Sequence, residues 1–157
     1  MSDIRRIEIR LARAEDVAQL AALRATLWPE SSAAEHAAEL QEIVAGRVPG
    51  VLPMVVLVAV TANAKLAGFL EVGLRSHADG CDWTRPVGYV EGWFVAVEMR
   101  RRGIGKALLQ AAEEWARGQG CKEMASDTQM HNRTSQRVHE ALGFEVTERA
   151  ILYRKTL

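Results

Sequence analysis

A segment rich in arginine and glycine is the clearest sign of chemistry in this sequence. Arg100, Arg101 and Arg102 follow a hydrophobic stretch, and Gly103 and Gly105 come directly after them. Apolar residues at helical spacing come next, so the segment is predicted to be a loop that opens a helix. The first N–H groups of a helix lack intrahelical partners, and the helix dipole favours negative charge there. The spacing therefore predicts a site for a phosphorylated ligand.

Two common phosphate loops do not fit this spacing. A P-loop has a glycine five positions before its Gly-Lys pair and a Ser or Thr after that pair, whereas these places hold Arg100 and Ala107. A dinucleotide fingerprint has a third glycine three residues after the second, where this chain has Leu108. The pattern that remains is Arg-x-x-Gly-x-Gly after a strand. The alternative interpretation of this segment is an ordinary strand-to-helix turn beside a solvated basic cluster.

Length and composition restrict the class of protein. With 157 residues, of which 48% are hydrophobic and 25% charged, the chain is expected to form one soluble domain over residues 1–157. A net charge of zero argues against general nucleic-acid binding. No apolar run approaches the roughly 20 residues that span a membrane, and no signal peptide is visible. Cys81 and Cys121 lack metal-site spacing, so we expect reduced thiols in a cytoplasmic protein without a metal.

The elements that must position the loop follow from the periodicity of the apolar residues. Strands are predicted over 7–11, 54–60, 66–74, 88–97, 123–127 and 146–154, and helices over 16–27, 32–46, 104–117 and 134–142. The order is therefore β-α-α-β-β-β-α-β-α-β, without a repeat or a linker. Glu35, Glu39 and Glu42 share one face of the second helix. These carboxylates form either its solvated side or a wall that faces a cationic ligand.

The loop, the order of elements and the run Ala141-Leu142-Gly143-Phe144 resemble the GNAT superfamily of N-acetyltransferases over nearly the whole chain. The resemblance implies an α/β protein with the GNAT fold, a central mixed twisted sheet flanked by helices. It also implies acetyl-CoA as the acetyl donor. Several strings are more similar to the aminoglycoside 6′-N-acetyltransferases within that superfamily, namely Leu27-Trp28-Pro29, Gly80-Cys81-Asp82 and the segments 90–95, 120–127 and 135–155. This subgroup acetylates the 6′-amine of aminoglycoside antibiotics, confers resistance and is commonly homodimeric.

The resemblance assigns two sets of residues to ligands. Contacts with acetyl-CoA are implied for Trp93, Phe94, Val95, Arg100, Arg101, Arg102, Gly103, Ile104, Gly105, Lys106 and Asn132. Contacts with the aminoglycoside are implied for Trp28, His77, Glu91, Asp127 and Glu148. His77 and Trp83 lie in a loop where the family often carries an aromatic contact, and the alignment slips there by one residue. An aminoglycoside is a polycation, so carboxylates in its pocket are physically reasonable.

Acetyl transfer requires a neutral amine that attacks the thioester carbonyl. Glu91 is the candidate base, directly or through a water, and the alternative is that it only binds the ammonium as a counter-ion. A backbone N–H near Phe94 or Val95, where a bulge is expected, would polarise the thioester oxygen. His139, at a position where many GNAT enzymes have tyrosine, and Tyr153 are candidate acids for the leaving thiolate, which could also leave unassisted.

Other functions remain open on the sequence alone. A GNAT enzyme could acetylate a different acceptor, such as a polyamine, an amino sugar or a protein N-terminus. A non-catalytic module that senses acyl-CoA would also carry the loop Arg100–Lys106.

Overall fold

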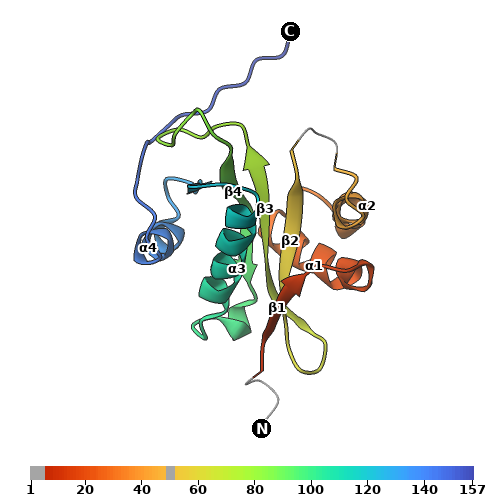
Figure 1. Cartoon of the computed structure of the whole chain (residues 1–157). Coiled ribbons are helices and arrows are strands. Elements are labelled where there is room, and N and C mark those ends of the chain that lie inside the picture. Colours follow the sequence, from red (N-terminus) through yellow and green to blue (C-terminus); the bar gives the residue numbers. More distant parts are fainter. Residues whose placement is uncertain (1–5, 49–51) are drawn as a thin grey trace.

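A twisted mixed sheet forms the centre of the molecule (Figure 1). The structure is a computed structural model that describes residues 6–48 and 52–157. Within these ranges the sheet has five strands in the order β1-β2-β3-β4-β5. Their bounds are Glu8–Leu11 for β1, Met54–Val60 for β2, Leu66–Arg75 for β3, Val87–Val95 for β4 and Met124–Ser126 for β5. Neighbouring strands are antiparallel except β4 and β5, which are parallel.

Helices cover both faces of this sheet. A short 3-10 turn, η2 (Ala14–Asp16), leads into α1 (Val17–Leu27), and α1 and α2 (Ala33–Val44) lie on one side of the sheet (Figure 1). A second 3-10 turn, η3 (Val97–Met99), precedes α3 (Ile104–Gly118), which lies on the other side with α4 (Arg133–Ala141). The parallel strands β4 and β5 are joined through α3, as a parallel crossover requires. The predicted central mixed sheet flanked by helices is therefore confirmed.

Local sequence explains where the helices of the first half begin and end. Ser32 caps α2: its Oγ accepts from the N–H of Glu35, and the Glu35 carboxylate accepts from the N–H of Ser32 at 2.7 Å. Helix α1 ends at Leu27, and Trp28 has non-helical angles because the residue before Pro29 avoids the helical region. Both boundaries agree with the prediction to within about two residues.

The two faces of the sheet bury separate apolar clusters. Phe69 of β3 packs on the α1 and α2 side with Leu20 and Leu40. The next residue, Leu70, points to the opposite face and packs with Leu108 of α3, since successive side chains of a strand alternate. Each cluster is continuous from strand to helix, so burial on both faces holds β3 and β4, the central strands, in place.

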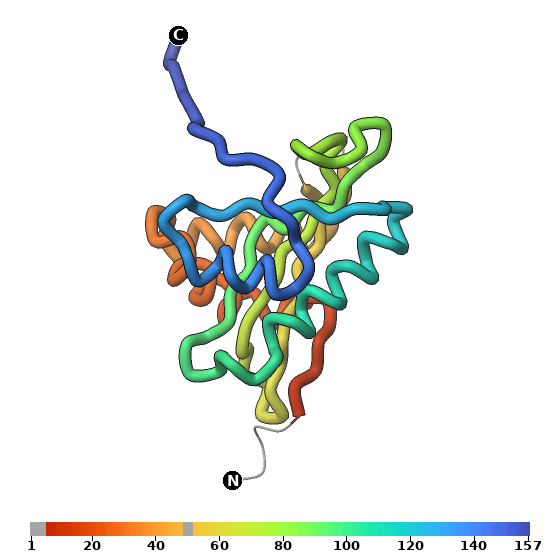
Figure 2. The backbone as a smooth tube through the Cα atoms, turned by 90° about the vertical axis from the view of Figure 1, so that its left-hand side faces the viewer, coloured from red at the N-terminus to blue at the C-terminus, as the bar shows by residue number. Residues whose placement is uncertain are grey.

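One predicted strand is wrong. Residues 146–154 form no strand and instead extend away from the sheet as part of the C-terminal segment (Figures 1 and 2). In the part of the chain that the structure describes, no backbone hydrogen bond involves a residue after Phe144. A strand requires a neighbour for its N–H and C=O groups, and within residues 6–48 and 52–157 no strand is paired with the segment. Alternating hydrophobicity predicts a strand but cannot show whether a partner strand is within reach.

Candidate active site

An opening in the sheet lies between β4 and β5. The two strands pair only from Gly88 with Met124 to Val90 with Ser126. Directly beyond this last pair, β4 carries a bulge: Val72 of β3 is paired with Val90 and Glu71 with Gly92, so Glu91 is the extra residue. A bulge bends its strand and ends regular pairing. The bulge was predicted near Phe94 or Val95, which is wrong, because the extra residue sits where β5 ends.

The backbone of β4 past the bulge has an unpaired edge toward the opening. The N–H of Ala96 donates to the carbonyl of Ala67 on β3 at 2.9 Å. Backbone groups of an antiparallel strand alternate in direction, so the N–H of Phe94 also faces β3. The N–H groups of Trp93 and Val95 therefore face the opening. They can donate to a ligand that lies along this edge in place of a strand.

The predicted phosphate loop lies at the end of the same edge. Gly103 precedes the first turn of α3 with φ of +78°, a left-handed conformation that favours glycine. The first intrahelical bond of α3 runs from the N–H of Ala107 to the carbonyl of Gly103. The N–H groups of Ile104, Gly105 and Lys106 consequently have no intrahelical acceptor and form an anion site. A β-carbon on Gly105 would lie 3.6 Å from the Trp93 ring, so the loop adjoins the edge of β4.

The three arginines of the loop have different surroundings. Arg100 donates from Nε to the carbonyl of Val95 at 2.9 Å, and its guanidinium lies 5.6 Å from the centre of the Phe94 ring. Arg101 and Arg102 are exposed, and Arg101 has a positive φ of 61°. Arg100 therefore fixes the loop to β4, while its two neighbours face solvent, where they can meet phosphate.

Carboxylates flank the opening on both strands. Glu91 follows the last paired residue of β4, and Asp127 follows the last paired residue of β5. Tyr89, which is paired with Ala125, lies one pair before the end of this ladder. Burial, followed by the negative charge of Asp127, raises the pKa of its hydroxyl to about 12. The structure thus brings Glu91 and Asp127, both predicted substrate contacts, to one end of the strand pair.

Sequence reasoning missed the guanidinium of Arg75 at this place. Its Nε and Nη2 donate to the two carboxylate oxygens of Glu91 at 2.9 and 2.8 Å. The same guanidinium stacks on the Tyr89 ring, with its carbon 3.4 Å from the ring centre. The proximity depends on the register between β3 and β4, in which Arg75 is paired with Val87. No local motif signals it.

Trp28 packs against the strand directly beside Glu91. A β-carbon on Gly92 would lie 2.4 Å from Cη2 of Trp28, so only glycine admits the ring at this distance. The Trp28 carbonyl lies 3.0 Å from Nε2 of His36. The Arg24 guanidinium lies 5.1 Å from the centre of the indole. Trp28, another predicted substrate contact, is thus held against Gly92, the residue that follows Glu91 in β4.

Beneath Trp28 lies a buried ionic network that the sequence did not reveal. Arg24 of α1 and Glu71 of β3 are 4% and 1% exposed, and Arg24 Nε lies 2.7 Å from Glu71 Oε1. Arg24 Nη1 also donates to Glu39 of α2 at 2.8 Å. Burial raises the pKa of the Glu71 carboxyl, while the charge and hydrogen bond of Arg24 oppose that rise. The network joins α1 and α2 to β3, at the residue of β3 that lies opposite the bulge of β4.

The three glutamates on one face of α2 each have a hydrogen-bonding partner. Glu35 completes the helix cap with Ser32, and Glu42 pairs with Arg47 at 2.9 Å. Glu39 binds Arg24. The stripe is consequently a set of paired side chains, and of the three only Glu39 belongs to the network beside Trp28.

His139 of α4 lies close to the opening, and Asn132 directly precedes the first turn of the same helix. Nδ1 of His139 lies 2.8 Å from the carbonyl of Ser135, so this nitrogen is assigned the proton, and Nε2 then accepts from the hydroxyl of Ser126 at 2.8 Å. The imidazole meets the ring of Trp93 edge-on, 5.4 Å between centres. Asn132 caps α4 by accepting from the N–H of Ser135, which leaves its amide N–H groups available as donors.

The structure does not bring every predicted residue to the opening. Tyr153 and Glu148 lie in the exposed C-terminal segment, and the side chain of Tyr153 is 91% exposed. His77 is exposed in the loop after β3, where its Nδ1 lies 3.2 Å from the hydroxyl of Ser76. Among the described residues, none of these three has a hydrogen bond or ion pair to Glu91 or Asp127. Their predicted roles stay predictions.

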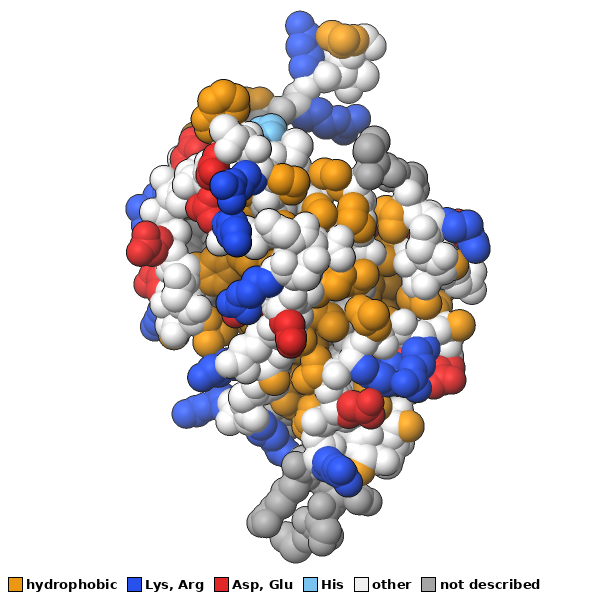
Figure 3. Space-filling view, in the orientation of Figure 1, with side chains coloured by type: hydrophobic (Ala, Val, Ile, Leu, Met, Phe, Trp, Pro, Cys, Tyr) orange, Lys and Arg blue, Asp and Glu red, His pale blue; other side chains and the backbone are white. Residues whose placement is uncertain are grey.

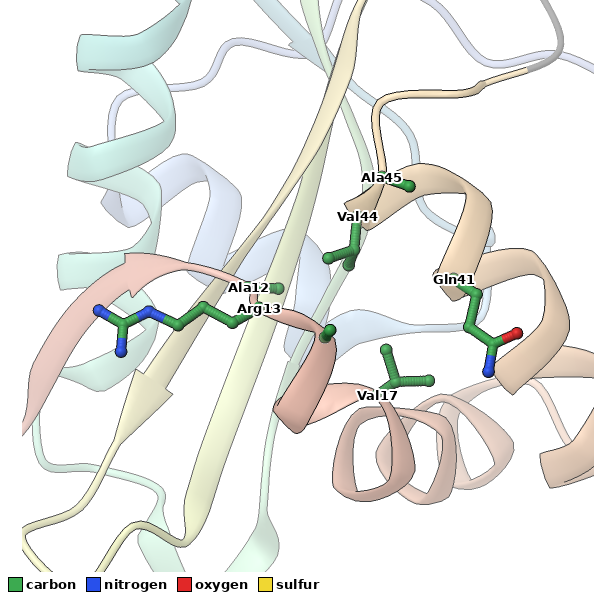
Figure 4. Close-up of a pocket in the computed structure, with 7 residues that line it drawn as sticks. Ala12, Arg13, Val17, Gln41, Val44 and Ala45 are labelled. Atoms are coloured by element: carbon green, nitrogen blue, oxygen red, sulfur yellow. The ribbon is translucent and has the colours of Figure 1, made fainter.

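Other features of the surface lie apart from the opening. A hollow between the turn η2, α1 and the end of α2 is bordered by Arg13, Val17, Gln41 and Val44 (Figure 4) and includes no predicted site residue. Within residues 6–48 and 52–157, no group of three His, Cys, Asp or Glu side chains is placed to hold a metal ion. No helix in these ranges has the length and apolar character needed to cross a membrane.

Comparison with known proteins identifies relatives across almost the entire chain. The model of the acetyltransferase (GNAT) family matches residues 17–144. An aminoglycoside N(6′)-acetyltransferase type 1 from Klebsiella aerogenes is 40% identical over 149 residues, 95% of this chain and 96% of the relative. The protein with the same name from Serratia marcescens is 42% identical over 87% of this chain and 90% of its own length.

Solved structures of such enzymes have the same fold. AAC(6′)-Iy in complex with the bisubstrate analogue CoA-S-monomethyl-acetylneamine is 37% identical, with a TM-score of 0.86 over 97% of this chain and 99% of that one. The aminoglycoside 6′-N-acetyltransferase AAC(6′)-Ih from Acinetobacter baumannii is 32% identical, with a TM-score of 0.85 over the same shares. The resemblance stated from the sequence is therefore confirmed.

Proposed function

Because this chain belongs to the GNAT family of acetyltransferases, we propose that it transfers the acetyl group of acetyl-CoA to the 6′-amino group of aminoglycosides and so inactivates these antibiotics. The observation that carries the proposal is the position of Glu91 and Asp127, one residue beyond the last pair of β4 and β5. Carboxylates on both sides of an opening suit a polycation. The relatives named as aminoglycoside acetyltransferases supply the acceptor.

The opened edge of β4 is the proposed site of the acetyl donor. The N–H groups of Trp93 and Val95 would bind the acetyl and pantetheine groups, and the amide of Asn132 would bind the pantetheine arm. The pyrophosphate would lie on the free N–H groups at the start of α3, beside Arg101 and Arg102. A solved relative, AAC(6′)-Iy, is described in complex with CoA, which supports the assignment.

The amine must lose a proton before it attacks the thioester carbon. We assign that proton to Glu91, directly or through a water, because its side chain is 29% exposed and lies at the opening. The N–H of Val95 would stabilise the negative charge on the thioester oxygen as the new C–N bond forms. The thiolate of CoA then leaves. Of the two candidate acids, His139 lies beside Trp93, whereas Tyr153 is exposed, so His139 is the one we propose. Its Nδ1 proton is held by the carbonyl of Ser135, so the ring would have to carry a second proton, on Nε2, and give that proton to the thiolate.

We further propose that the enzyme is a homodimer in which residues 148–157 lie on the partner, while Thr147 packs against Gly80 of its own chain. This segment extends away from the sheet (Figure 1), and Ile151, Leu152 and Tyr153 are 77%, 91% and 91% exposed. Hydrophobic side chains also gather between α3 and α2 on the face seen in Figure 3. Apolar surfaces of this kind mark interfaces. Light scattering should give twice the mass of one chain for the full-length protein and the mass of a single chain for a variant that ends at Phe144.

A cytoplasmic location completes the proposal. Acetyl-CoA is a metabolite of the cytoplasm, and the structure leaves Cys81 and Cys121 as free thiols, which suits a reducing compartment.

Release of CoA tests the central assignment. Kanamycin and tobramycin, which carry a 6′-amine, should release CoA from acetyl-CoA, and matched aminoglycosides with a 6′-hydroxyl should not. Turnover with polyamines or a peptide N-terminus but not with kanamycin would refute the aminoglycoside assignment. Binding of acetyl-CoA without turnover of any amine would indicate a sensing module instead.

A further inference from the structure

Arg75, the last residue of β3, holds the carboxylate that the substrate is expected to need. Two parallel hydrogen bonds of 2.9 and 2.8 Å join its guanidinium to the two oxygens of Glu91. The guanidinium lies flat on the ring of Tyr89, 3.4 Å from its centre. This fork places a cation on both oxygens of Glu91, the same oxygens that an ammonium group of a substrate would need as acceptors.

The fold places Arg75 there. Arg75 and Tyr89 share the sheet face toward α1 and α2, and the bulge keeps Glu91 on that face next to Gly92. The hydrogen bond to Glu91 is the main cause that raises the pKa of Arg75, and the charge of Asp127 adds to it. The guanidinium therefore lies in the field of both carboxylates that flank the opening.

We propose that Arg75 determines specificity as a tethered competitor for Glu91. Before the substrate binds, its guanidinium occupies the carboxylate, and an ammonium group of the aminoglycoside displaces it. The inference rests on the proposed function. The pair is easily exchanged, since its side chains are 45% and 29% exposed and exposed ion pairs are weak. A polycation, which also meets Asp127, displaces the guanidinium more readily than a monoamine does.

Removal of the competitor should strengthen substrate binding. The apparent affinity for substrate is proportional to the fraction of molecules in which the Glu91 carboxylate is free. Arg75→Gln raises that fraction to one, so it should lower KM for kanamycin about two- to fivefold and leave kcat nearly unchanged. Arg75→Lys, which keeps the charge but cannot form the fork, should give an intermediate KM. Arg85→Gln is the matched control. Arg85 is exposed, and its one ion pair among the described residues is with Asp82, at 3.7 Å. The KM of this variant should therefore equal that of the wild type.

Other outcomes overturn the inference. A higher KM or a lower kcat in Arg75→Gln would mean that Arg75 positions Glu91 for substrate, and an unchanged KM would mean that it does not compete. Calorimetric titration of the same variants with kanamycin keeps the test independent of turnover: tighter binding by Arg75→Gln supports competition, and equal or weaker binding refutes it. Failure of the proposed function appears separately, as a wild-type enzyme that releases no CoA with any 6′-amine. Thermal unfolding of each variant verifies that it is folded.

Discussion

Removal of Arg24 should destabilise the protein in a manner that depends on pH. The guanidinium of Arg24 lies 2.7 Å from Glu71 and 2.8 Å from Glu39, and the substitution Arg24→Met keeps most of the volume of the stem. Glu71 is 1% exposed, so without this cation its carboxylate would remain buried and unpaired. Such a group takes up a proton instead.

The magnitude follows from the proton that Glu71 must bind. Its pKa in the unfolded chain is near the ordinary glutamate value of 4.5, and each pH unit above this value costs about 1.4 kcal/mol while the folded state keeps the acid neutral. The loss in Arg24→Met is then at most about 1.4 kcal/mol at pH 5.5, because burial already raises the pKa of Glu71 in the wild type. At pH 8 it reaches about 3–5 kcal/mol, the cost of a broken buried pair. For a chain of this size that loss lowers Tm by roughly 10 °C.

The direction in which the stability loss changes with pH distinguishes an unpaired Glu71 from a simple loss of packing. A carboxyl whose folded pKa lies above its unfolded pKa stabilises the fold most below the unfolded value, and this stability is lost as pH rises toward the folded value. Urea unfolding of the wild type and of Arg24→Met at pH 5.5 and pH 8 measures the difference. The double variant Arg24→Met/Glu71→Gln lacks the titrating group and should lose this pH dependence. A loss under about 1 kcal/mol that is equal at both pH values would refute the reasoning.

Three further predictions concern the site. Glu91→Gln should lower kcat about 100-fold if Glu91 accepts the proton, whereas a rise in KM at constant kcat would show a binding group only. Gly92→Ala places a β-carbon 2.4 Å from Trp28, so it should raise KM for kanamycin and lower the free energy of unfolding by about 1–3 kcal/mol. Gly118→Ala is the matched control, because a β-carbon there meets open space. Equal effects of the two substitutions would contradict the contact between Gly92 and Trp28. Gly105→Phe should weaken acetyl-CoA binding on the order of tenfold by calorimetry because it blocks the anion site, while unchanged affinity would disprove the loop assignment.

Local patterns in the sequence by themselves determine much of this protein. The spacing of Arg100, Gly103 and Gly105 predicts a loop at a helix start, and Ser32 with Glu35 predicts the cap of α2. These features depend on residues a few positions apart, whose geometry follows directly from helix and turn chemistry. The resemblance to the GNAT superfamily and to its aminoglycoside 6′-N-acetyltransferases is likewise readable from sequence, and the comparisons confirm it.

Only the tertiary structure decided which side chains meet. The pair of Arg75 with Glu91 depends on strand register, and the network of Arg24 with Glu71 depends on how α1 packs on β3. The bulge was expected too late in β4, because pairing on both sides of a strand decides where an extra residue is accommodated. The last strand was predicted from alternation alone, yet a strand forms only where another strand offers its N–H and C=O groups. Sequence spacing encodes the local elements, while the contacts of the site arise from packing between distant ones.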